Sequence, residues 1–330
     1  MDRAQGIAIP AARLIAVDAD SAGQRLDNFL IRHLKGVPKT HVYRIIRSGE
    51  VRINKGRASA DTRVAEGDSV RLPPVRISEK VAEKAAHPAP AREFPQLLED
   101  DHVLAIDKPA GVAVHGGSGV SFGVIEQLRT ARPGAKFLEL VHRLDRETSG
   151  ILLVAKKRSA LTGLQDQFRE RETGKTYLAA VRGEWPDKLK VIDQPLHKYL
   201  VAGGDSGEGE RRVKVVPQDD PDGMRSITLV KVARRLPGAT LLEVTIKTGR
   251  THQIRVHLAW AGHPILGDEK YGDFEFNKSL HRPAKGPALR RMFLHAWRLS
   301  FNHPASGERV ELTAELPSEL RQFADHGSPV

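Results

Sequence analysis

The chain has 330 residues, of which 40% are hydrophobic and 28% are charged, and this composition is typical of a globular protein rather than a disordered one. It contains no cysteine, which excludes disulfides, cysteine-ligated zinc sites and thiol nucleophiles. The formal net charge of +11 favours a polyanionic partner, with nucleic acid ahead of an anionic membrane.

The first segment, residues 1–20, is predicted to be a flexible N-terminal arm. Its mildly apolar sequence is interrupted by Pro10 and Arg13 and follows no basic stretch, so we do not expect a signal peptide. The longest aliphatic run in the chain, Ile151 to Ala155, is far too short to span a membrane. We therefore expect a cytoplasmic protein that does not associate with a membrane.

Residues 21–75 are predicted to form a small domain with two helices followed by short strands. Apolar residues at helical spacing begin at Leu26, and Pro38 suits the first turn of a second helix. One face of the second helix is apolar and is predicted to be buried. The other face carries a basic stripe with an aromatic ring, suited to phosphates and to stacking on a base or ribose: Lys39, Tyr43, Arg44 and Arg47. The alternative is a solvated helix face with one amphipathic tyrosine.

Short strands are predicted where VRIN, from Val51, and DSVRL, from Asp68, alternate between apolar and polar residues. The segments RLDNFL (25–30), SGEVRINKGR (48–57) and EGDSVRL (66–72) resemble the alpha-L RNA-binding module of a small-subunit ribosomal protein. The resemblance implies an S4-like RNA-binding domain over residues 21–75. The stretch rich in proline, alanine and charge that follows predicts a linker over residues 76–93.

Residues 94–325 are long enough for a complete catalytic domain. Within it, Asp145 lies between Arg143 and Arg146, directly before the apolar run ILLVA. The flanking cations favour an ionised carboxylate, which can act as a nucleophile or as a general base. The alternative is a structural ion pair beside a turn, and spacing alone favours that alternative.

Further along, apolar residues alternate on one face of a predicted strand over residues 241–246. Thr251 is expected to cap a helix that Gly262 ends. His252 and His257 would diverge on this helix, so we predict no metal site there. The acidic run at residues 99–101 also predicts a solvated turn rather than a magnesium site, because neighbouring side chains cannot all point at one ion.

The segment HRLDRETSGILLVAKK, from His142, strongly resembles the catalytic motif of the RluA/RluC/RluD family of pseudouridine synthases. The resemblance implies that Asp145 is the catalytic carboxylate. It also implies that Arg143 handles the flipped nucleotide, because a base extracted from a stacked fold leaves a gap that a side chain can fill or hold. His142, from the same motif, is included among the predicted RNA-binding residues.

Three further segments match the same family in order. QFRERETGKTYLAAVRG contains the family's active-site tyrosine, here Tyr177, whose ring can stack on uracil and whose hydroxyl can serve a proton step. Spacing alone favours a half-buried strand tyrosine at this position. LLEVTIKTGRTHQIRVHLAWAGHPILGD contains the family's active-site arginine, here Arg255, which the resemblance pairs with Asp145. MFLHAWRLSFNHP indicates Leu294 as an apolar wall of the uracil pocket.

The resemblance implies an α+β fold, with a small N-terminal alpha-L domain and a pseudouridine synthase domain whose mixed, largely antiparallel sheet is flanked by helices. It also implies an isomerisation without cofactors on uridines of large-subunit ribosomal RNA or its assembly intermediates. The ERRVKV stretch near Arg211 favours the RluC branch.

The reaction has two possible first steps. Asp145 either attacks the anomeric carbon of the sugar or removes a sugar proton to give a glycal. Two alternative functions are the same chemistry on transfer RNA, and an RNA-binding ribosome-assembly factor whose catalysis is secondary. We expect a monomer.

Overall fold

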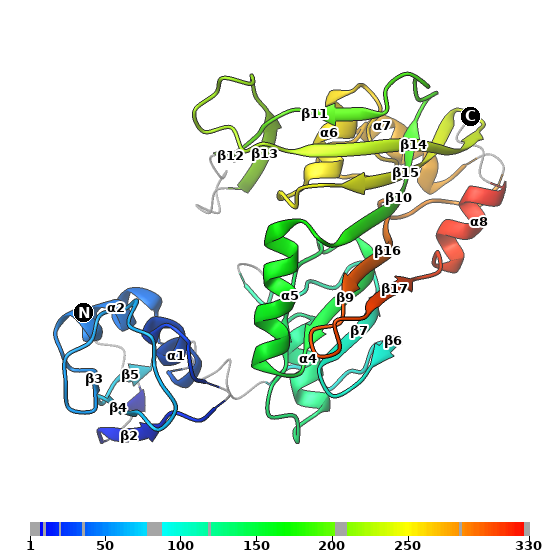
Figure 1. The fold of residues 1–330 in the computed structure, drawn as a ribbon. Coiled ribbons are helices and arrows are strands. Elements are labelled where there is room, and N and C mark those ends of the chain that lie inside the picture. The colour runs from blue at the N-terminus through cyan, green and yellow to red at the C-terminus, as the bar shows by residue number, and fades with distance from the viewer. Residues whose placement is uncertain are drawn as a thin grey trace. The chain divides into compact units, whose positions relative to one another are not determined.

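The computed structural model describes residues 7–8, 11–19, 21–34, 37–77, 88–117, 120–201, 210–283 and 286–326. The chain divides into two compact units, Met1–Ala91 and Arg92–Val330, which are described separately (Figure 1). None of the helices in these ranges combines the length and the apolar composition that a membrane span requires.

The N-terminal unit packs two helices against a small antiparallel sheet with strand order β2-β4-β3, and β1 pairs separately with β5. Its elements are β1 (Ile7–Ala8), β2 (Arg13–Ala16), α1 (Leu26–His33), α2 (Lys39–Arg47), β3 (Arg52–Ile53), β4 (Ser69–Leu72) and β5 (Arg76–Ile77).

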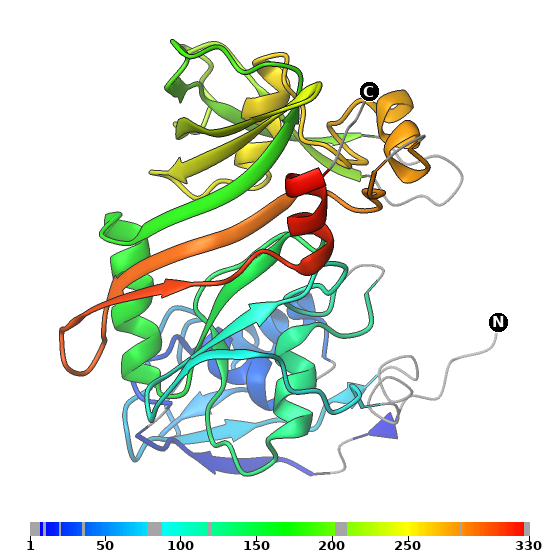
Figure 2. The same cartoon turned by 90° about the vertical axis from the view of Figure 1, so that its right-hand side faces the viewer.

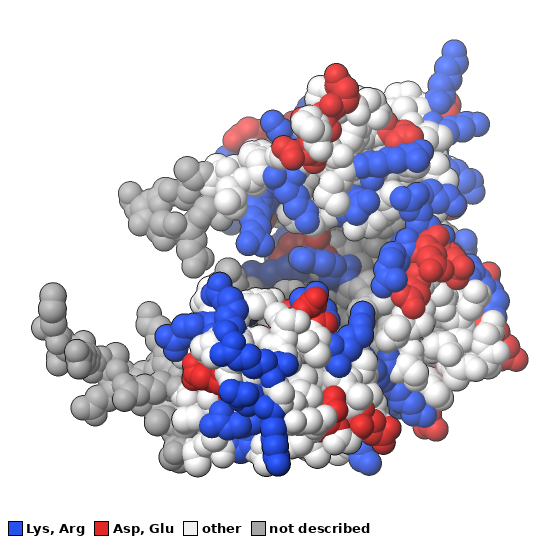
Figure 3. Space-filling model, turned by 60° about the vertical axis from the view of Figure 1, so that its left-hand side comes forward, with Lys and Arg blue, Asp and Glu red and all other residues white. Residues whose placement is uncertain are grey.

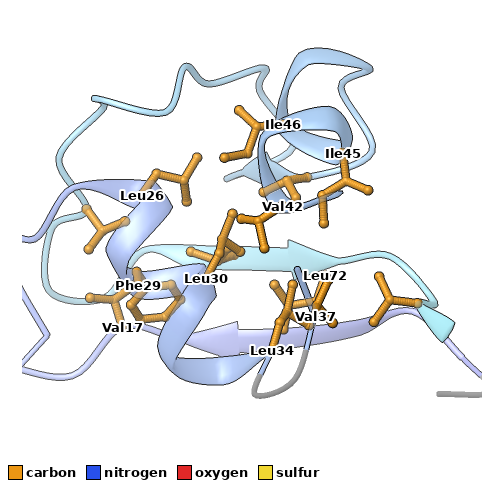
Figure 4. Packing of buried hydrophobic residues seen from close by; sticks show 14 residues of the cluster. Val17, Leu26, Phe29, Leu30, Leu34, Val37, Val42, Ile45, Ile46 and Leu72 are labelled. Carbon is orange, nitrogen blue, oxygen red and sulfur yellow. The ribbon is translucent and has the colours of Figure 1, made fainter. Parts of the chain in front are cut away.

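The core of this unit lies between the two helices and the sheet (Figure 4). In this cluster Leu30 of α1 faces Val42 of α2, and the cluster also contains Phe29, Ile45 and Leu72. All five side chains are at most 1% exposed. Burial of each stabilises the fold by roughly 1.5–3 kcal/mol before the entropy of ordering is subtracted. The predicted apolar face of the second helix is thus buried, and the basic face is left toward solvent.

The second unit contains a ten-stranded sheet with strand order β11-β14-β15-β10-β16-β9-β7-β6, in which β17 also pairs with β16 and β8 with β9. Among the described strand pairs of this sheet only β9–β16 is parallel. Its strands are β6 (Gln96–Glu99), β7 (Val103–Lys108), β8 (Glu139–Leu140), β9 (Ser149–Ala155), β10 (Gly174–Arg182), β11 (Val191–Asp193), β14 (Ile227–Leu236), β15 (Ala239–Ile246), β16 (Leu294–Asn302) and β17 (Arg309–Thr313). A separate hairpin joins β12 (Leu196–Val201) to β13 (Glu210–Val215).

Helices cover both faces of this sheet (Figures 1 and 2). Against one face of β9 packs α5, and against the opposite face packs α4. The strands β10 and β15 are likewise covered by α6 on one face and by α7 and α8 on the other. These helices are α4 (Val124–Ala131), α5 (Arg158–Glu170), α6 (Gln253–Trp260), α7 (Phe274–His281) and α8 (Ser318–His326). The mixed, largely antiparallel sheet with flanking helices confirms the predicted α+β class.

Strand β9 is the buried centre of the sheet, with all seven residues buried, as expected for an apolar run covered on both sides. It begins beside the start of β16, where Ser149 pairs with His295. Gly150 permits this contact because its φ is +109° and a Cβ atom there would lie 2.2 Å from the carbonyl oxygen of Ala296. The loop that precedes β9 is therefore held at the middle of the sheet.

Candidate active site

A cavity of about 110 Å³ opens where this loop meets α6 and the strands β10, β15 and β16. Its polar wall includes Asp145 from the loop, with His252 and Arg255 from the start of α6. Its apolar wall is formed by side chains from several segments that are far apart in the sequence: Leu144, Tyr177, Ile246, Ile254 and Leu294. The cavity thus combines one carboxylate with apolar surface that suits a flat, weakly polar ring.

Arg255 lies between two carboxylates and binds both. Its Nη1 donates to Oδ2 of Asp145 at 3.0 Å, and its Nε and Nη2 donate to Asp268 at 2.7 and 2.8 Å. Burial alone would lower the pKa of Arg255, but hydrogen bonds to Asp268 and the charges of both carboxylates raise that pKa above its usual value. The guanidinium is therefore a fixed cation, and it holds Asp145 in one orientation.

Asp268 anchors this arrangement from the buried side of Arg255. It is 1% exposed and also accepts hydrogen bonds from the backbone N–H groups of Lys270 and Tyr271. Burial raises its pKa, but the hydrogen bonds from Arg255 and the backbone outweigh burial and hold it below the usual value. Sequence reasoning missed Asp268, although it is the last residue of the segment matched to the family around Arg255. Its partners become visible only when residues 255 and 268 meet in space.

Tyr177 and Leu294 lie on neighbouring strands and both line the cavity. Burial and the nearby charge of Asp145 raise the pKa of Tyr177, so its hydroxyl stays protonated at neutral pH. Leu294 is 3% exposed and presents apolar surface to the same cavity as the ring of Tyr177. The position of both residues fits a pocket for a planar base.

The two residues before Leu144 have different surroundings. Arg143 is exposed, lines the cavity, and forms no ion pair with any side chain in the described ranges. His142 does not line the cavity; its ring stacks on Phe168 at 4.8 Å, and its Nε2 accepts from the N–H of Leu153 at 3.1 Å. Burial lowers the pKa of His142 to about 4, so the imidazole is neutral. The structure therefore places Arg143 at the site and His142 in the packing of the domain.

The start of α6 differs from the prediction. Thr251 does not cap the helix; the N-cap is His252, which has a left-handed backbone with φ of 53° and makes no side-chain cap hydrogen bond. The side chain of Gln253 turns back instead and accepts from the N–H of Arg250 at 3.1 Å. Gly262 follows the helix with φ of +85°, as expected for a residue that ends one.

In the N-terminal unit, the predicted stripe on α2 is solvent-exposed: Lys39, Tyr43, Arg44 and Arg47. The hydroxyl of Tyr43 donates to Asp27 at 3.0 Å, and Arg25 pairs with the same carboxylate at 2.8 Å. This contact fixes the ring of Tyr43 while leaving 38% of the residue exposed. Figure 3 shows Lys and Arg spread widely over one face of the molecule, with Asp and Glu in smaller groups.

The comparisons with known proteins agree with this geometry. Residues 102–260 match the model of the RNA pseudouridylate synthase family, and residues 24–70 match the S4 domain. The chain is 50% identical over 317 residues to the ribosomal large subunit pseudouridine synthase C of Escherichia coli (strain K12), covering 95% of this chain and 96% of that protein. It is 49% identical over 318 residues to the protein of the same name from Pasteurella multocida (strain Pm70), covering 95% and 93%.

Solved structures lead to the same family. Human RNA Pseudouridylate Synthase Domain Containing 4 superposes with a TM-score of 0.56 at 27% identity, over 70% of this chain and 92% of that one. Human RNA Pseudouridylate Synthase Domain Containing 1 superposes with a TM-score of 0.55 at 25% identity, over 72% and 90%. The predicted family and the predicted S4-like domain are thus confirmed, and the chain belongs to the RluA/RluC/RluD family of RNA pseudouridine synthases.

Proposed function

We propose that this enzyme isomerises specific uridines of large-subunit ribosomal RNA and that Asp145 is its catalytic carboxylate. The observation that carries the proposal is the cavity itself, where Asp145 is the one carboxylate among the described lining residues and is oriented by Arg255 at 3.0 Å. The relatives named ribosomal large subunit pseudouridine synthase C support the choice of RNA.

The reaction needs a bond exchange on a flipped nucleotide. The bond from C1′ of the ribose to N1 of uracil breaks, the base turns, and a new bond joins C1′ to C5. The proton on C5 then leaves and N1 gains one, so the product is an isomer of the substrate. Asp145 acts first, either by attack on C1′ or by removal of a sugar proton. The apolar walls of the cavity allow the detached base to turn without being held by strong hydrogen bonds.

The neighbouring residues serve this sequence of steps. Arg255 positions Asp145, and Tyr177 stacks on the uracil and assists the proton transfer from C5. Leu294 adds an apolar wall to the uracil pocket. Arg143, exposed at the cavity and free of ion pairs with described side chains, handles the flipped nucleotide. Direct RNA contact by His142 stays a prediction without support from its position, because its ring packs on Phe168.

Different segments of the chain have different proposed roles. We propose that residues 21–75 bind RNA through the exposed stripe on α2, that residues 94–325 form the catalytic domain, and that residues 76–93 link the two. The expected flexible arm of residues 1–20 needs a correction, because Arg13–Ala16 form β2 and pair with β4, and Val17 is buried in the core of the N-terminal unit. Residues 1–6 of the arm and 78–87 of the linker lie outside the described residues. We expect this enzyme in the cytoplasm, since its proposed substrate is ribosomal RNA. The monomeric state stays a prediction, which gel filtration of the full chain tests.

The test is pseudouridine mapping on unmodified large-subunit ribosomal RNA incubated with the wild-type protein or with Asp145→Asn. The expected result is new pseudouridine with the wild type and none with the variant. A matched control is Asp101→Asn, an exposed carboxylate of the same unit outside the cavity, which should act like the wild type.

Each other result has a definite meaning. An active Asp145→Asn protein would refute the role of Asp145. A wild-type protein without product on ribosomal RNA but active on transfer RNA would refute the proposed substrate. Ribosome-assembly defects in cells that Asp145→Asn corrects would favour an assembly factor whose catalysis is secondary.

A further inference from the structure

His252 is a second polar side chain beside Asp145, and sequence reasoning considered it only as a metal ligand. Its side chain is 16% exposed and its Nε2 lies 3.8 Å from Oδ2 of Asp145. It is one of four non-glycine residues with positive φ in the described ranges, and among those four only His252 lines the active-site cavity. An uncommon backbone conformation at a reactive site invites a functional explanation.

The hydrogen bonds around Tyr271 assign the tautomer of this histidine. The hydroxyl oxygen of Tyr271 accepts from the N–H of Val213 on β13 at 3.0 Å and lies 2.8 Å from Nδ1 of His252. The hydroxyl hydrogen finds an acceptor if Nδ1 is unprotonated, whereas the other tautomer would leave that hydrogen without a partner among the described residues. Nδ1 therefore accepts, and Nε2 carries the proton that faces Asp145.

Tyr271 is itself held in place, so the tautomer is fixed rather than incidental. Its ring lies 5.1 Å from the guanidinium carbon of Arg255 and 5.5 Å from the ring of His252. Burial lowers the pKa of His252 to about 4, so at neutral pH it is an uncharged donor. An uncharged donor can approach the carboxylate without cancelling the negative charge that the reaction uses.

Both polar neighbours of the Asp145 side chain are directed at the same oxygen. Arg255 donates to Oδ2 at 3.0 Å and the Nε2 of His252 faces Oδ2 at 3.8 Å, while Oδ1 has no hydrogen-bond partner in the described part of the chain. A distance of 3.8 Å is too long for a hydrogen bond, but such contacts commonly shorten when substrate binds.

We propose that His252 is a positioning residue for Asp145: as the Nε2–H tautomer set by Tyr271, it secures Oδ2 together with Arg255 and leaves Oδ1 as the oxygen that reacts. The inference rests on the proposed function of Asp145. It assigns no direct contact between His252 and the uracil.

Two substitutions of His252 distinguish the proposed hydrogen-bond donor role from the alternative that the residue matters only for its left-handed backbone conformation. The amide nitrogen of glutamine is as many bonds from Cα as Nε2 of histidine, whereas that of asparagine corresponds to Nδ1. Asparagine, however, adopts the left-handed backbone more readily than glutamine. A donor role therefore predicts that His252→Gln retains more activity than His252→Asn, and a backbone role predicts the reverse order.

The experiment measures single-turnover pseudouridine formation and RNA affinity for full-length variants on unmodified large-subunit ribosomal RNA. We expect His252→Asn to lose about tenfold or more in rate with unchanged affinity, as removal of one hydrogen bond to a charged group predicts. His252→Gln should recover most of that rate. Thermal melts of both variants identify any decrease in rate that comes from unfolding.

A second variant tests whether Tyr271 acts through His252 by setting its tautomer. Tyr271→Phe keeps the ring against Arg255 but removes the hydroxyl, so it should slow the reaction in the wild-type background and add nothing to His252→Asn. Independent, additive effects of the two substitutions would overturn the coupling. Better activity for His252→Asn than for His252→Gln, or a slower rate explained by weaker RNA binding, would overturn the positioning role.

Asp145→Asn is measured in parallel. If it is active, the proposed function of Asp145 fails and the inference fails with it. If it is inactive while His252→Asn keeps the wild-type rate, only the role of His252 is refuted.

Discussion

At the scale of single residues, the site depends on one cation shared by two acids. Arg255 uses Nε and Nη2 of its guanidinium for Asp268 and the remaining Nη1 for Asp145. A planar group with donors in a fixed fork can make these contacts at the same time, whereas an ammonium on a flexible stem cannot. The orientation of the Asp145 carboxylate thus depends on the shape of the arginine as well as on its charge.

This geometry predicts the effect of Arg255→Lys. The variant keeps the positive charge but not the fork, so we expect single-turnover pseudouridine formation to fall by about 100-fold, on the order seen when one preorganised electrostatic interaction is removed. RNA affinity, measured by filter binding, should stay close to the wild-type value. Arg235→Lys, on an exposed pair with Asp187, is the matched control and should be fully active. A fully active Arg255→Lys variant would show that a positive charge at position 255 is enough to orient Asp145, without the fork geometry of arginine.

At the scale of elements, the parallel pairing of β9 with β16 sets the position of the loop that carries Asp145. The two strands approach closely at Gly150, and the loop with Asp145 enters β9 just before this point. On the other side of β16, Tyr177 of β10 pairs with Ala296 next to a bulge between Thr176 and Tyr177. The register of these three strands therefore sets the positions of both the Asp145 carboxylate and the Tyr177 ring.

Gly150→Ala tests this close approach. The added Cβ would meet the backbone of Ala296 at 2.2 Å and the φ of +109° disfavours any L side chain, so the strands must separate. We expect the free energy of unfolding, measured with denaturant, to fall by roughly 3 kcal/mol. Gly134→Ala is the control, because a Cβ there meets no atom within 4 Å and φ is not positive. Equal stability of the two variants would contradict this account of how β9 and β16 pack.

The exposed stripe on α2 gives a prediction for RNA binding. The test replaces the three cations of the stripe together: Lys39→Gln, Arg44→Gln and Arg47→Gln. We expect weaker RNA affinity. We also expect a shallower slope of log affinity against log salt concentration, by about 0.7–0.9 for each RNA phosphate that the protein no longer neutralises. A control with the same change in net charge replaces cations that already pair with acidic side chains in the catalytic unit: Lys231→Gln, Arg234→Gln and Arg235→Gln. Similar slopes for the two triple variants would mean that the stripe is only a solvated face.

At the scale of the whole molecule, two packed histidines of the second unit are neutral: the half-buried His142 and the fully buried His295. Burial lowers the pKa of both His142 and His295 to about 4, while an unfolded histidine has a pKa near 6.5. His295 donates from Nε2 to the carbonyl of Ala314 and accepts at Nδ1 from Ser149, so its neutral form is fully hydrogen-bonded. These rings stabilise the fold only while they are uncharged.

The sign of the resulting pH dependence follows from proton uptake. Between pH 6.5 and about 4 the unfolded chain binds more protons than the folded one, so the stability of the catalytic unit falls as pH falls through this range. His142→Gln should flatten this slope, since glutamine can accept from Leu153 without titrating. The exposed His281→Gln is the control. The three tryptophans lie at positions 185, 260 and 297, so their fluorescence reports this unit alone. An unchanged slope in His142→Gln would contradict the assignment.

The sequence by itself determined the family, the two-part organisation of the RNA-binding and catalytic regions, and the identity of Asp145, Tyr177 and Arg255 as candidates. Those features are local, because motifs and the periodic patterns of buried helix and strand faces can be recognised from residues that are close together in the sequence. The apolar face of α2 could be predicted in the same way, and it is buried.

The tertiary structure decided which side chains share the cavity. Asp268 binds Arg255, His142 packs on Phe168 outside the cavity, and the N-cap of α6 is His252 rather than Thr251. The family resemblance had already paired Arg255 with Asp145, 110 positions away, and the structure places the two side chains 3.0 Å apart. The pair of Arg255 with Asp268, 13 positions apart, became visible only in the tertiary structure. No local pattern encodes such a pair, because the distance between distant segments is set by how the sheet and its helices pack, and that packing is a property of the whole unit.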